Sequence, residues 1–380
     1  MTTTNQDRLG RAPGRSFPVP TPWAATFEAV PRALFLPDLM WAHDMAAGTS
    51  VPVDRTANLD AWATAAQADI PIITQWDDGQ HAGREPGVVP TSSASMPSVV
   101  AGMLDDLDVQ PGMRVLEIGT GTGWNAALLA RHLGDQAVTT IEVDPAVATD
   151  ASHHLSAAGL HPKVIVGDGA DGYSPGAPYD RVIATCGMRS IPYSWVEQTR
   201  PSGIILAPWG THFGNGDALV RLTVGRDGTA SGPFLRPVEF MKMRSQRLVW
   251  PQPPTAGGTV SEGTTRLVLP AHHRFAPFPF ALGLRLPDVT HAVQPHDDGE
   301  TLWLYSLAET EPAWSATEFR GGDVHRVQQY GARRLWDEVE AAHDWWQDQG
   351  RPGFDRFGLT VDQDGERSWL DHPDNPVRAR

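Results

Sequence analysis

The chain has 380 residues, more than one ordinary domain, so we expect two domains. Its 30 lysine and arginine residues are outnumbered by 45 aspartate and glutamate residues, and the net charge of −15 argues against nucleic acid as a partner. The single cysteine, Cys186, excludes an internal disulfide, and no stretch reads as a signal peptide or an apolar membrane span. We therefore expect a cytoplasmic protein that binds neither nucleic acid nor a membrane.

Residues 1–24 are polar and carry proline and glycine, which predicts a disordered or loosely packed N-terminal segment. A core domain is expected over residues 25–247, where apolar strand patterns alternate with helical ones. Such alternation predicts an α/β fold with a parallel sheet and right-handed crossovers. Ligands of such sheets bind at the carboxyl ends of the strands.

The most informative stretch, residues 115–123, reads VLEIGTGTG: an apolar strand that opens through three alternate glycines into a helix over Trp124–Leu133. Glycine lets the backbone approach a ligand closely, and the free N–H groups of the following helix point toward it. The pattern predicts a nucleoside-binding loop made of Gly119, Thr120, Gly121 and Gly123, with Glu117 before it. NAD is disfavoured, because Trp124 stands where its fingerprint requires a third glycine.

Two further strands carry acidic residues at their carboxyl ends. A strand over Ala137–Val143 contains Glu142, whose carboxylate can accept two hydrogen bonds from vicinal ribose hydroxyls; the alternative is a solvated strand-end acid. A helix capped by Asp144 and ended by Gly159 leads to a strand over Lys163–Val166 and then to Gly167-Asp168-Gly169. One more strand is expected over Asp180–Thr185.

The C-terminal third reads differently. After strands at Ile204–Ala207 and Ala218–Val224, residues 248–262 read as a Pro/Gly linker, and 263–380 as a small α+β domain for substrate recognition. Its expected elements are strands at Thr265–Leu269, Phe280–Leu286, Thr301–Leu307 and Gly358–Asp362, and a helix between Gly331 and Gly350. Most of the chain's 14 tryptophans are expected in cores, with a minority forming a peptide-binding surface.

The residues before the glycine loop point to a family. Thr91-Ser-Ser-Ala-Ser-Met-Pro-Ser98, an apolar helix, Pro111-Gly112 and the E-x-G-x-G-x-G loop together resemble the protein-L-isoaspartate O-methyltransferases. The resemblance covers residues 25–245 and is supported at Val30–Phe35, Gly167–Gly169, Ala177–Asp180 and Pro201–Gly203. It implies a class I, Rossmann-like methyltransferase fold with helices on both sheet faces. The implied cofactor is S-adenosyl-L-methionine, with S-adenosyl-L-homocysteine as product, held by the loop residues with Glu117, Glu142, Val143, Asp168 and Gly169.

The resemblance also implies an active-site serine. The S-x-P segment is two residues longer than the family pattern, so we place this serine at Ser95, with Ser93 as the alternative. Thr91 and Ser92 are candidate substrate contacts, as is Thr185. Arg189 can form a fork on a peptide carboxylate or be a surface charge. The serines can alternatively cap the following helix.

The extra length and the segments Val327–Gly331, Arg333–Trp336 and Phe357–Val361 resemble the branch associated with ATP-grasp-cyclised ribosomal peptides. This resemblance implies methylation of an Asp in a macrocyclic peptide, followed by closure to an aspartimide. Isoaspartate repair is the alternative within the same chemistry, and a non-catalytic peptide scaffold is an alternative of another class.

A carboxylate is already anionic at neutral pH, so its methylation needs no general base. The enzyme has to place one carboxylate oxygen in line with the methyl carbon and to exclude water. No metal site is expected, because His153-His154 and His272-His273 are adjacent pairs without ligand spacing.

Overall fold

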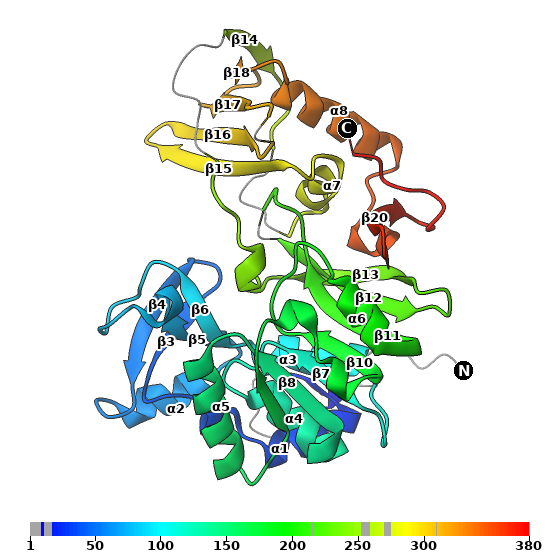
Figure 1. Cartoon of the computed structure of the whole chain (residues 1–380). Coiled ribbons are helices and arrows are strands. Elements are labelled where there is room, and N and C mark those ends of the chain that lie inside the picture. Colours follow the sequence, from blue (N-terminus) through cyan, green and yellow to red (C-terminus); the bar gives the residue numbers. More distant parts are fainter. Residues whose placement is uncertain are drawn as a thin grey trace. The chain divides into compact units, whose positions relative to one another are not determined.

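The computed structural model describes residues 9–10, 17–214, 216–251, 259–269, 275–308 and 310–379 (Figure 1). The chain divides into two compact units. Unit 1 contains residues up to 186 with 192–207 and 221–230, and unit 2 contains 187–191, 208–220 and the chain from 231 onward. This division does not coincide with the expected linker, so residues 248–262 as a boundary between separately folding domains stay a prediction.

Unit 1 is built around a parallel sheet in the order β11-β10-β7-β8-β9, in which every neighbouring pair is parallel. β11 continues beyond Ala207 into unit 2. The strands alternate with helices as the sequence predicts. The elements are β7 (Val115–Ile118), α4 (Trp124–Leu133), β8 (Val138–Glu142), α5 (Pro145–Ala157), β9 (Lys163–Val166), β10 (Tyr179–Ala184), α6 (Tyr193–Gln198) and β11 (Thr199–Trp209).

A second sheet of unit 1 was not anticipated from the sequence. Four antiparallel strands in the order β4-β3-β5-β6 pack with α2 around a small core that includes Met40, Trp62 and Ile72. The last strand runs into α3, so this sheet positions the serine segment. The elements are β3 (Leu39–Asp44), β4 (Thr49–Asp54), α2 (Leu59–Gln67), β5 (Ile72–Trp76), β6 (Pro90–Ala94) and α3 (Pro97–Leu107).

The N-terminal segment packs more tightly than expected where the structure describes it. Strands β1 (Leu9–Gly10) and β2 (Val19–Pro20) pair antiparallel, and α1 (Ala24–Ala29) follows. Phe17, Val19 and Trp23 are buried, and the Trp23 ring stacks on His132 of α4 with 4.2 Å between centroids. In contrast to the loose packing expected for residues 1–24, Phe17, Val19 and Trp23 therefore belong to the core, where the Phe17 ring also lies 6.2 Å from the Phe27 ring of α1.

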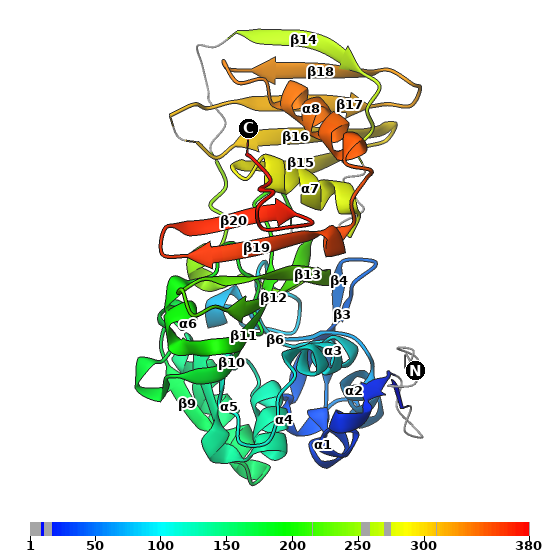
Figure 2. The ribbon, with the colours of Figure 1, turned by 90° about the vertical axis from the view of Figure 1, so that its right-hand side faces the viewer.

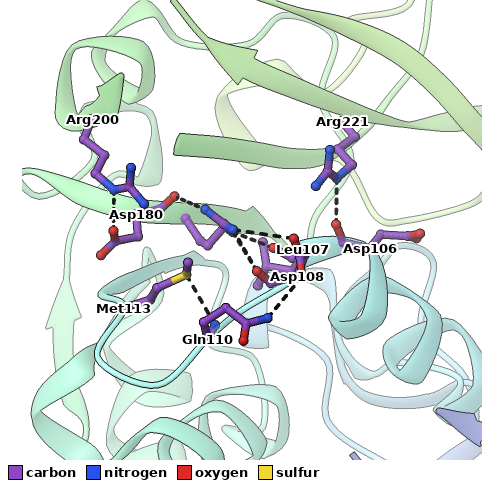
Figure 3. Close-up of polar contacts among 9 residues, drawn as sticks. Asp106, Leu107, Asp108, Gln110, Met113, Asp180, Arg200 and Arg221 are labelled. Atoms are coloured by element: carbon purple, nitrogen blue, oxygen red, sulfur yellow. Dashed lines mark hydrogen bonds and ion pairs between the residues drawn. The ribbon is translucent and has the colours of Figure 1, made fainter. Parts of the chain in front are cut away.

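A polar cluster anchors α3 at the amino-terminal end of the parallel sheet (Figure 3). Arg181 of β10 donates hydrogen bonds to the main-chain oxygens of Leu107 and Asp108, at 2.6 and 2.7 Å. Arg221 donates to the Asp106 oxygen at 2.8 Å, and Arg200 pairs with Asp180. These bonds satisfy the carbonyl groups that end α3. They lie at the sheet end opposite to the glycine loop, so we assign them a structural role.

Unit 2 contains a five-stranded antiparallel sheet in the order β14-β18-β17-β16-β15. Figure 2 shows α7 and α8 across one face of this sheet. Leu302, Leu304, Val327 and Trp336 belong to the core between the sheet and these helices. The elements are β14 (Val260–Thr265), α7 (Pro277–Arg285), β15 (Val289–His296), β16 (Gly299–Ser306), β17 (Trp314–Phe319), β18 (His325–Tyr330) and α8 (Leu335–Asp348).

The rest of unit 2 is a strand series in the order β12-β13-β19-β20. β19 and β20 form an antiparallel hairpin, with the expected turn at Asp364-Gly365. The elements are β12 (Asp217–Val224, which continues into unit 1), β13 (Ala230–Val238, which begins there), β19 (Phe357–Asp362) and β20 (Gly365–Leu370).

Two strand predictions in unit 2 are wrong. Residues 280–286 lie mostly in α7, which begins at Pro277, because proline is favoured in the first helical turn and a short apolar run does not distinguish a buried strand from a buried helix. The strand expected at Thr265–Leu269 lies earlier, in β14. Thr265 Oγ1 accepts a 3.0 Å hydrogen bond from the Leu267 N–H, which turns the chain at the strand end.

Within the described residues, no helix has both the length and the apolar character to cross a membrane.

Candidate active site

The glycine loop between β7 and α4 has a backbone that only glycine adopts readily. The φ angles are +90° at Gly119, +53° at Gly121 and +88° at Gly123. A Cβ on Gly121 would lie 3.3 Å from the main-chain oxygen of Ser93, and one on Gly119 would lie 3.0 Å from Thr185 Oγ1. The loop therefore runs directly against the serine segment and against the residue that follows β10.

Glu117 lies in β7 and is fully buried. Its carboxylate oxygens accept hydrogen bonds from Asn125 Nδ2 at 2.7 Å and from Thr140 Oγ1 at 2.6 Å. Thr140 Oγ1 in turn lies 2.7 Å from Thr120 Oγ1 in the loop. Burial raises the pKa of Glu117 from its usual 4.5 to about 7, against the opposing effect of the two hydrogen bonds. This network connects the loop to β7, β8 and α4.

Glu142 ends β8 and faces the loop. Its Oε2 accepts a 2.9 Å hydrogen bond from the Gly121 N–H, and its Oε1 accepts one of 3.2 Å from the Asp144 N–H. The next side chain, Val143, is 42% exposed although it is apolar. A partly exposed carboxylate beside an exposed apolar side chain suits a ligand that joins hydroxyl groups to an apolar ring.

Asp168 follows β9 at the same end of the sheet. Its Oδ1 accepts a 2.9 Å hydrogen bond from the Ala170 N–H and caps a short 3-10 helix over Gly169–Asp171. The Gly167 N–H donates to the Glu142 main-chain oxygen at 3.0 Å, which holds this turn beside β8. Glu117, Glu142 and Asp168 thus lie at the carboxyl ends of three neighbouring parallel strands, as predicted.

The serine segment is connected to the cofactor side through Gln75. Thr91 Oγ1 donates to Gln75 Oε1 at 2.8 Å, and Gln75 Nε2 donates to Asp144 Oδ2 at 3.1 Å. Ser92 is buried, and its hydroxyl accepts a 3.3 Å hydrogen bond from Thr74. These contacts fix Thr91 and Ser92 within the sheet, whereas their proposed role as substrate contacts stays a prediction.

Neither candidate serine caps α3. The helix has Met96 as its N-cap without a side-chain hydrogen bond, and the Ser98 N–H donates instead to the Asp69 carboxylate at 2.9 Å. In the parts of the chain that the structure describes, the hydroxyls of Ser93 and Ser95 have no hydrogen-bond partner. Both remain free to bind a substrate, and the choice between them stays a prediction.

Arg32, for which no role is predicted from the sequence, holds the serine segment in place. Its buried guanidinium donates to the main-chain oxygens of Ala94 at 2.8 Å, Ile70 at 3.0 Å and Ala68 at 3.3 Å. It also lies over the ring of Trp124, the first residue of α4, at 5.7 Å from the centroid. The sequence offers one signal for this role: Arg32 is the single charged residue within the apolar run Val30–Phe35, one of the segments that carry the family resemblance.

The two candidate substrate residues after β10 fall in different units. Thr185 belongs to unit 1 and donates to the Gly119 main-chain oxygen, so its hydroxyl supports the loop. Arg189 belongs to unit 2, where its Nη1 donates to the Gly214 oxygen at 3.0 Å and its N–H to Gln246. Arg189 is partly buried, and this burial lowers its pKa. It is therefore not the fully exposed surface charge that is the alternative to a substrate contact.

Among the described residues, no group of three or more histidine, cysteine or acidic side chains is arranged to hold a metal. His154 Nδ1 lies 3.2 Å from the Thr122 oxygen. His272 and His273 lie outside the described residues.

The family model described as protein-L-isoaspartate(D-aspartate) O-methyltransferase matches residues 40–247, more than half of the chain. The chain belongs to this family. The match to the isoaspartate O-methyltransferase family includes the glycine loop and the serine segment, so the residues assembled above are those of a family member.

Curated relatives of the same name match a shorter stretch. A protein-L-isoaspartate O-methyltransferase of Pyrococcus horikoshii is 44% identical over 131 residues, which are 34% of this chain and 59% of that protein. One of Methanopyrus kandleri is 43% identical over 119 residues, 30% of this chain and 53% of that protein. The chain thus spans less than two thirds of the length of these relatives.

A solved structure named protein-L-isoaspartate O-methyltransferase resembles almost the whole chain. It has a TM-score of 0.53 at 22% identity and covers 93% of this chain and 96% of its own. The likeness shows the class I methyltransferase fold with an additional C-terminal sheet domain, as predicted. An additional domain after the core therefore also occurs in a protein of that name.

Proposed function

We propose that this chain is an S-adenosyl-L-methionine-dependent carboxyl methyltransferase that acts on L-isoaspartyl residues of proteins or peptides. Membership of the family supports the reaction class, and one relationship supports the placement of the reaction. Gly121 of the loop donates its N–H to Glu142, and a Cβ at Gly121 would lie only 3.3 Å from the main-chain oxygen of Ser93. The proposed cofactor loop and the proposed substrate segment are therefore immediate neighbours.

The residues of unit 1 suit the cofactor. Glu142 offers a carboxylate for vicinal hydroxyls, Val143 offers an apolar surface, and the glycine loop permits close backbone approach. When bound, the cofactor supplies an electrophilic methyl group on a sulfonium. The substrate carboxylate oxygen forms the new C–O bond as the methyl–sulfur bond breaks, and no proton has to be moved. Ser95 or Ser93 donates a hydrogen bond that orients the carboxylate without neutralising it.

A second candidate substrate is an ordinary Asp of a cyclised ribosomal peptide, which the resemblance of the C-terminal segments predicts as the main one. The comparisons favour isoaspartate, since the added C-terminal domain, one argument for that branch, also occurs in the solved structure named as an isoaspartate methyltransferase. The remaining support is the resemblance in Val327–Gly331 and neighbouring segments. On a cyclised peptide, the methyl ester would lose methanol when the adjacent backbone nitrogen attacks it.

One experiment separates these functions. The purified chain is incubated with methyl-labelled S-adenosyl-L-methionine and a pair of peptides that differ only in L-isoaspartate or L-aspartate at one position. Our proposal expects transfer to the isoaspartyl peptide and at least tenfold less to the aspartyl control. Labelling of a macrocyclic aspartyl peptide alone, with subsequent loss of methanol by mass spectrometry, would establish the second function. Cofactor binding without transfer to either would indicate a scaffold.

A further inference from the structure

The five-stranded sheet of unit 2 carries partly exposed aromatic side chains on the face that α7 and α8 do not cover. Along β16, Leu302 and Leu304 are fully buried toward the helices, whereas Trp303 and Tyr305 alternate with them and are partly exposed. Because successive strand residues point to opposite faces, these two rings lie on the other face. We call Trp303, Tyr305, Trp314 and Tyr330 the aromatic row.

The aromatic row crosses adjacent strands as one surface. Tyr305 lies opposite Trp314, and Trp314 lies opposite Tyr330, whose partner on the edge strand β14 is Val260. The rings of Trp314 and Tyr330 are stacked with 5.8 Å between centroids, and those of Trp303 and Tyr305 with 6.2 Å. Trp303 and Trp314, at 5.6 Å, join the two pairs. Val260 is 43% exposed and extends the apolar surface to the sheet edge.

The row is not part of the hydrophobic core of this unit. The core between sheet and helices already holds large buried side chains, including Trp336. Tryptophan and tyrosine that remain partly exposed on one contiguous face are enriched in binding surfaces, because they offer a large rigid contact area at a small entropic cost. The row spans two strand spacings, about 10 Å, and Val260 extends the apolar surface to three spacings, about 14 Å, which is the length of about four residues of an extended peptide.

The charges around the row select among ligands. Glu262, Glu318 and Arg326 point to the same face by strand register. Arg326 forms an ion pair with Glu262 at 2.6 Å, and Glu318 lies 4.0 Å from Arg320, so the charges beside the row are paired. The net charge of −15 on the whole chain disfavours a nucleic acid backbone, although bases stack on such rings. A polypeptide segment with proline or aromatic residues matches the apolar rings, and lysine or arginine in it is attracted by the negative charge of the chain.

We propose that the aromatic row is a docking surface for an extended, uncharged-to-basic segment of the polypeptide substrate, outside the residue that is methylated. The identity of the bound segment as part of the substrate rests on the proposed function. Docking of one segment raises the effective concentration of the reactive residue at the catalytic unit. The row therefore contributes to KM for long substrates and leaves short peptides unaffected.

Point variants of the full chain test this proposal, because a chain ending near residue 247 would also remove Glu366, which bonds Ile191 and Trp209. Binding of a fluorescein-labelled 20-residue peptide with proline, tyrosine and lysine but no isoaspartate is measured by anisotropy. The double variant Trp303→Ala with Trp314→Ala should bind at least tenfold more weakly. Trp250→Ala, at a 53% exposed tryptophan outside the row, is the matched control and should bind like the wild type.

Oxidative footprinting of the wild type provides a readout that does not depend on how the variant folds. The peptide should protect Trp303 and Trp314 and leave Trp250 unprotected. Equal binding by the double variant and the wild type, or protection elsewhere only, overturns the proposal. Tighter, row-dependent binding of a dT20 oligonucleotide or of cellohexaose would overturn the peptide assignment.

Kinetics separate this inference from the proposed function. For methyl transfer, the double variant should raise KM at least tenfold for a 20-residue isoaspartyl peptide and leave KM and kcat unchanged for a six-residue one. If the wild type methylates neither peptide, the proposed function fails, whereas the binding and footprinting results still decide the docking surface. Unchanged KM for the long peptide in an active double variant contradicts docking.

Discussion

The backbone N–H of Gly121 donates a 2.9 Å hydrogen bond to the carboxylate of Glu142, 21 residues later in the chain. This bond joins the glycine loop after β7 to the carboxyl end of β8. It brings together two residues that the sequence predicts separately as cofactor contacts: Gly121, because it has no side chain, and Glu142, because it carries a carboxylate. The loop is thereby held in a defined conformation at the position proposed for the cofactor.

Replacing Gly121 with valine should abolish binding of S-adenosyl-L-homocysteine. A β-branched residue at φ +53° is strained, and its Cβ would lie 3.3 Å from the Ser93 oxygen. Isothermal calorimetry on the folded variant measures this. Gly134→Ala is the control, because Gly134 has a φ of +94° but no atom near its Cβ position, so it carries the strain without the contact. Wild-type affinity in Gly121→Val would refute the loop assignment.

Glu142→Ala should weaken binding of S-adenosyl-L-homocysteine by about 1–3 kcal/mol, the size expected for hydrogen bonds to a charged group. The fold should remain intact, since the loop N–H can turn to water at this partly exposed site. Calorimetry is again the measurement. Exposed Glu197 in α6 provides the comparison, and an equal loss in Glu197→Ala would argue against a specific role of Glu142.

Ser95→Ala should lower kcat for an isoaspartyl peptide at least tenfold with little change in cofactor affinity, because the hydroxyl is proposed to orient only the substrate. Ser93→Ala is the internal comparison. A strong loss in Ser93→Ala with full activity in Ser95→Ala would move the assignment by two residues. Full activity of both would remove the serines from the mechanism, and since neither caps α3, stability should not change in either.

The sequence predicted the catalytic core well because its signals are local. The helix over Trp124–Leu133 and the strand over Lys163–Val166 match the structure residue for residue, since glycine and proline mark their ends. The strands β3–β6 were missed because their alternation of apolar and polar residues is irregular and their pairing is non-local. The apolar run of α7 was misread because, without periodicity, only the early prolines distinguished it from a strand.

For the site, the sequence predicted which residue types gather at the strand ends, but not what supports them. The carboxylates of Glu117, Glu142 and Asp168 follow from strand topology alone. The contacts of Arg32 and Gln75 depend on the unexpected sheet, so no spacing rule indicated them. The alternative that Ser95 caps α3 could not be tested from the sequence, because the Ser98 N–H donates to Asp69, which lies 29 residues earlier in the chain.

Arg32→Lys should lower kcat/KM for an isoaspartyl peptide about tenfold, because one ammonium cannot reach the three carbonyls that the guanidinium fork holds. The unpaired carbonyl groups should also cost about 1–3 kcal/mol in the free energy of unfolding. Peptide kinetics and urea unfolding measure the two effects. Arg55→Lys is the control, because Arg55 also lies over a tryptophan ring, that of Trp62, but is half exposed. Equal kinetics in both variants would deny Arg32 a positioning role.

Glu117→Gln should change the pH dependence of stability. Burial raises the pKa of Glu117 from 4.5 to about 7, so between these pH values the folded chain holds a proton that the unfolded chain has released. The free energy of unfolding therefore falls as pH rises through this window in the wild type. Glutamine stays uncharged, so the stability of Glu117→Gln relative to the wild type should rise from pH 4.5 to 7 by about 3 kcal/mol and then level off.

Urea unfolding at pH 5, 6, 7 and 8 measures this difference. A difference in the free energy of unfolding that is the same at every pH reports the altered hydrogen bonds to Asn125 and Thr140, because the amide has one acceptor oxygen where the carboxylate has two. Only a change of this difference with pH reports the ionisation of the buried Glu117 carboxylate. Exposed Glu197 provides the comparison, and the same change with pH in Glu197→Gln would argue against a specific effect of the buried carboxylate. Parallel curves for Glu117→Gln and the wild type would mean that the folded chain does not hold this proton and that Glu117 enters the loop network already ionised.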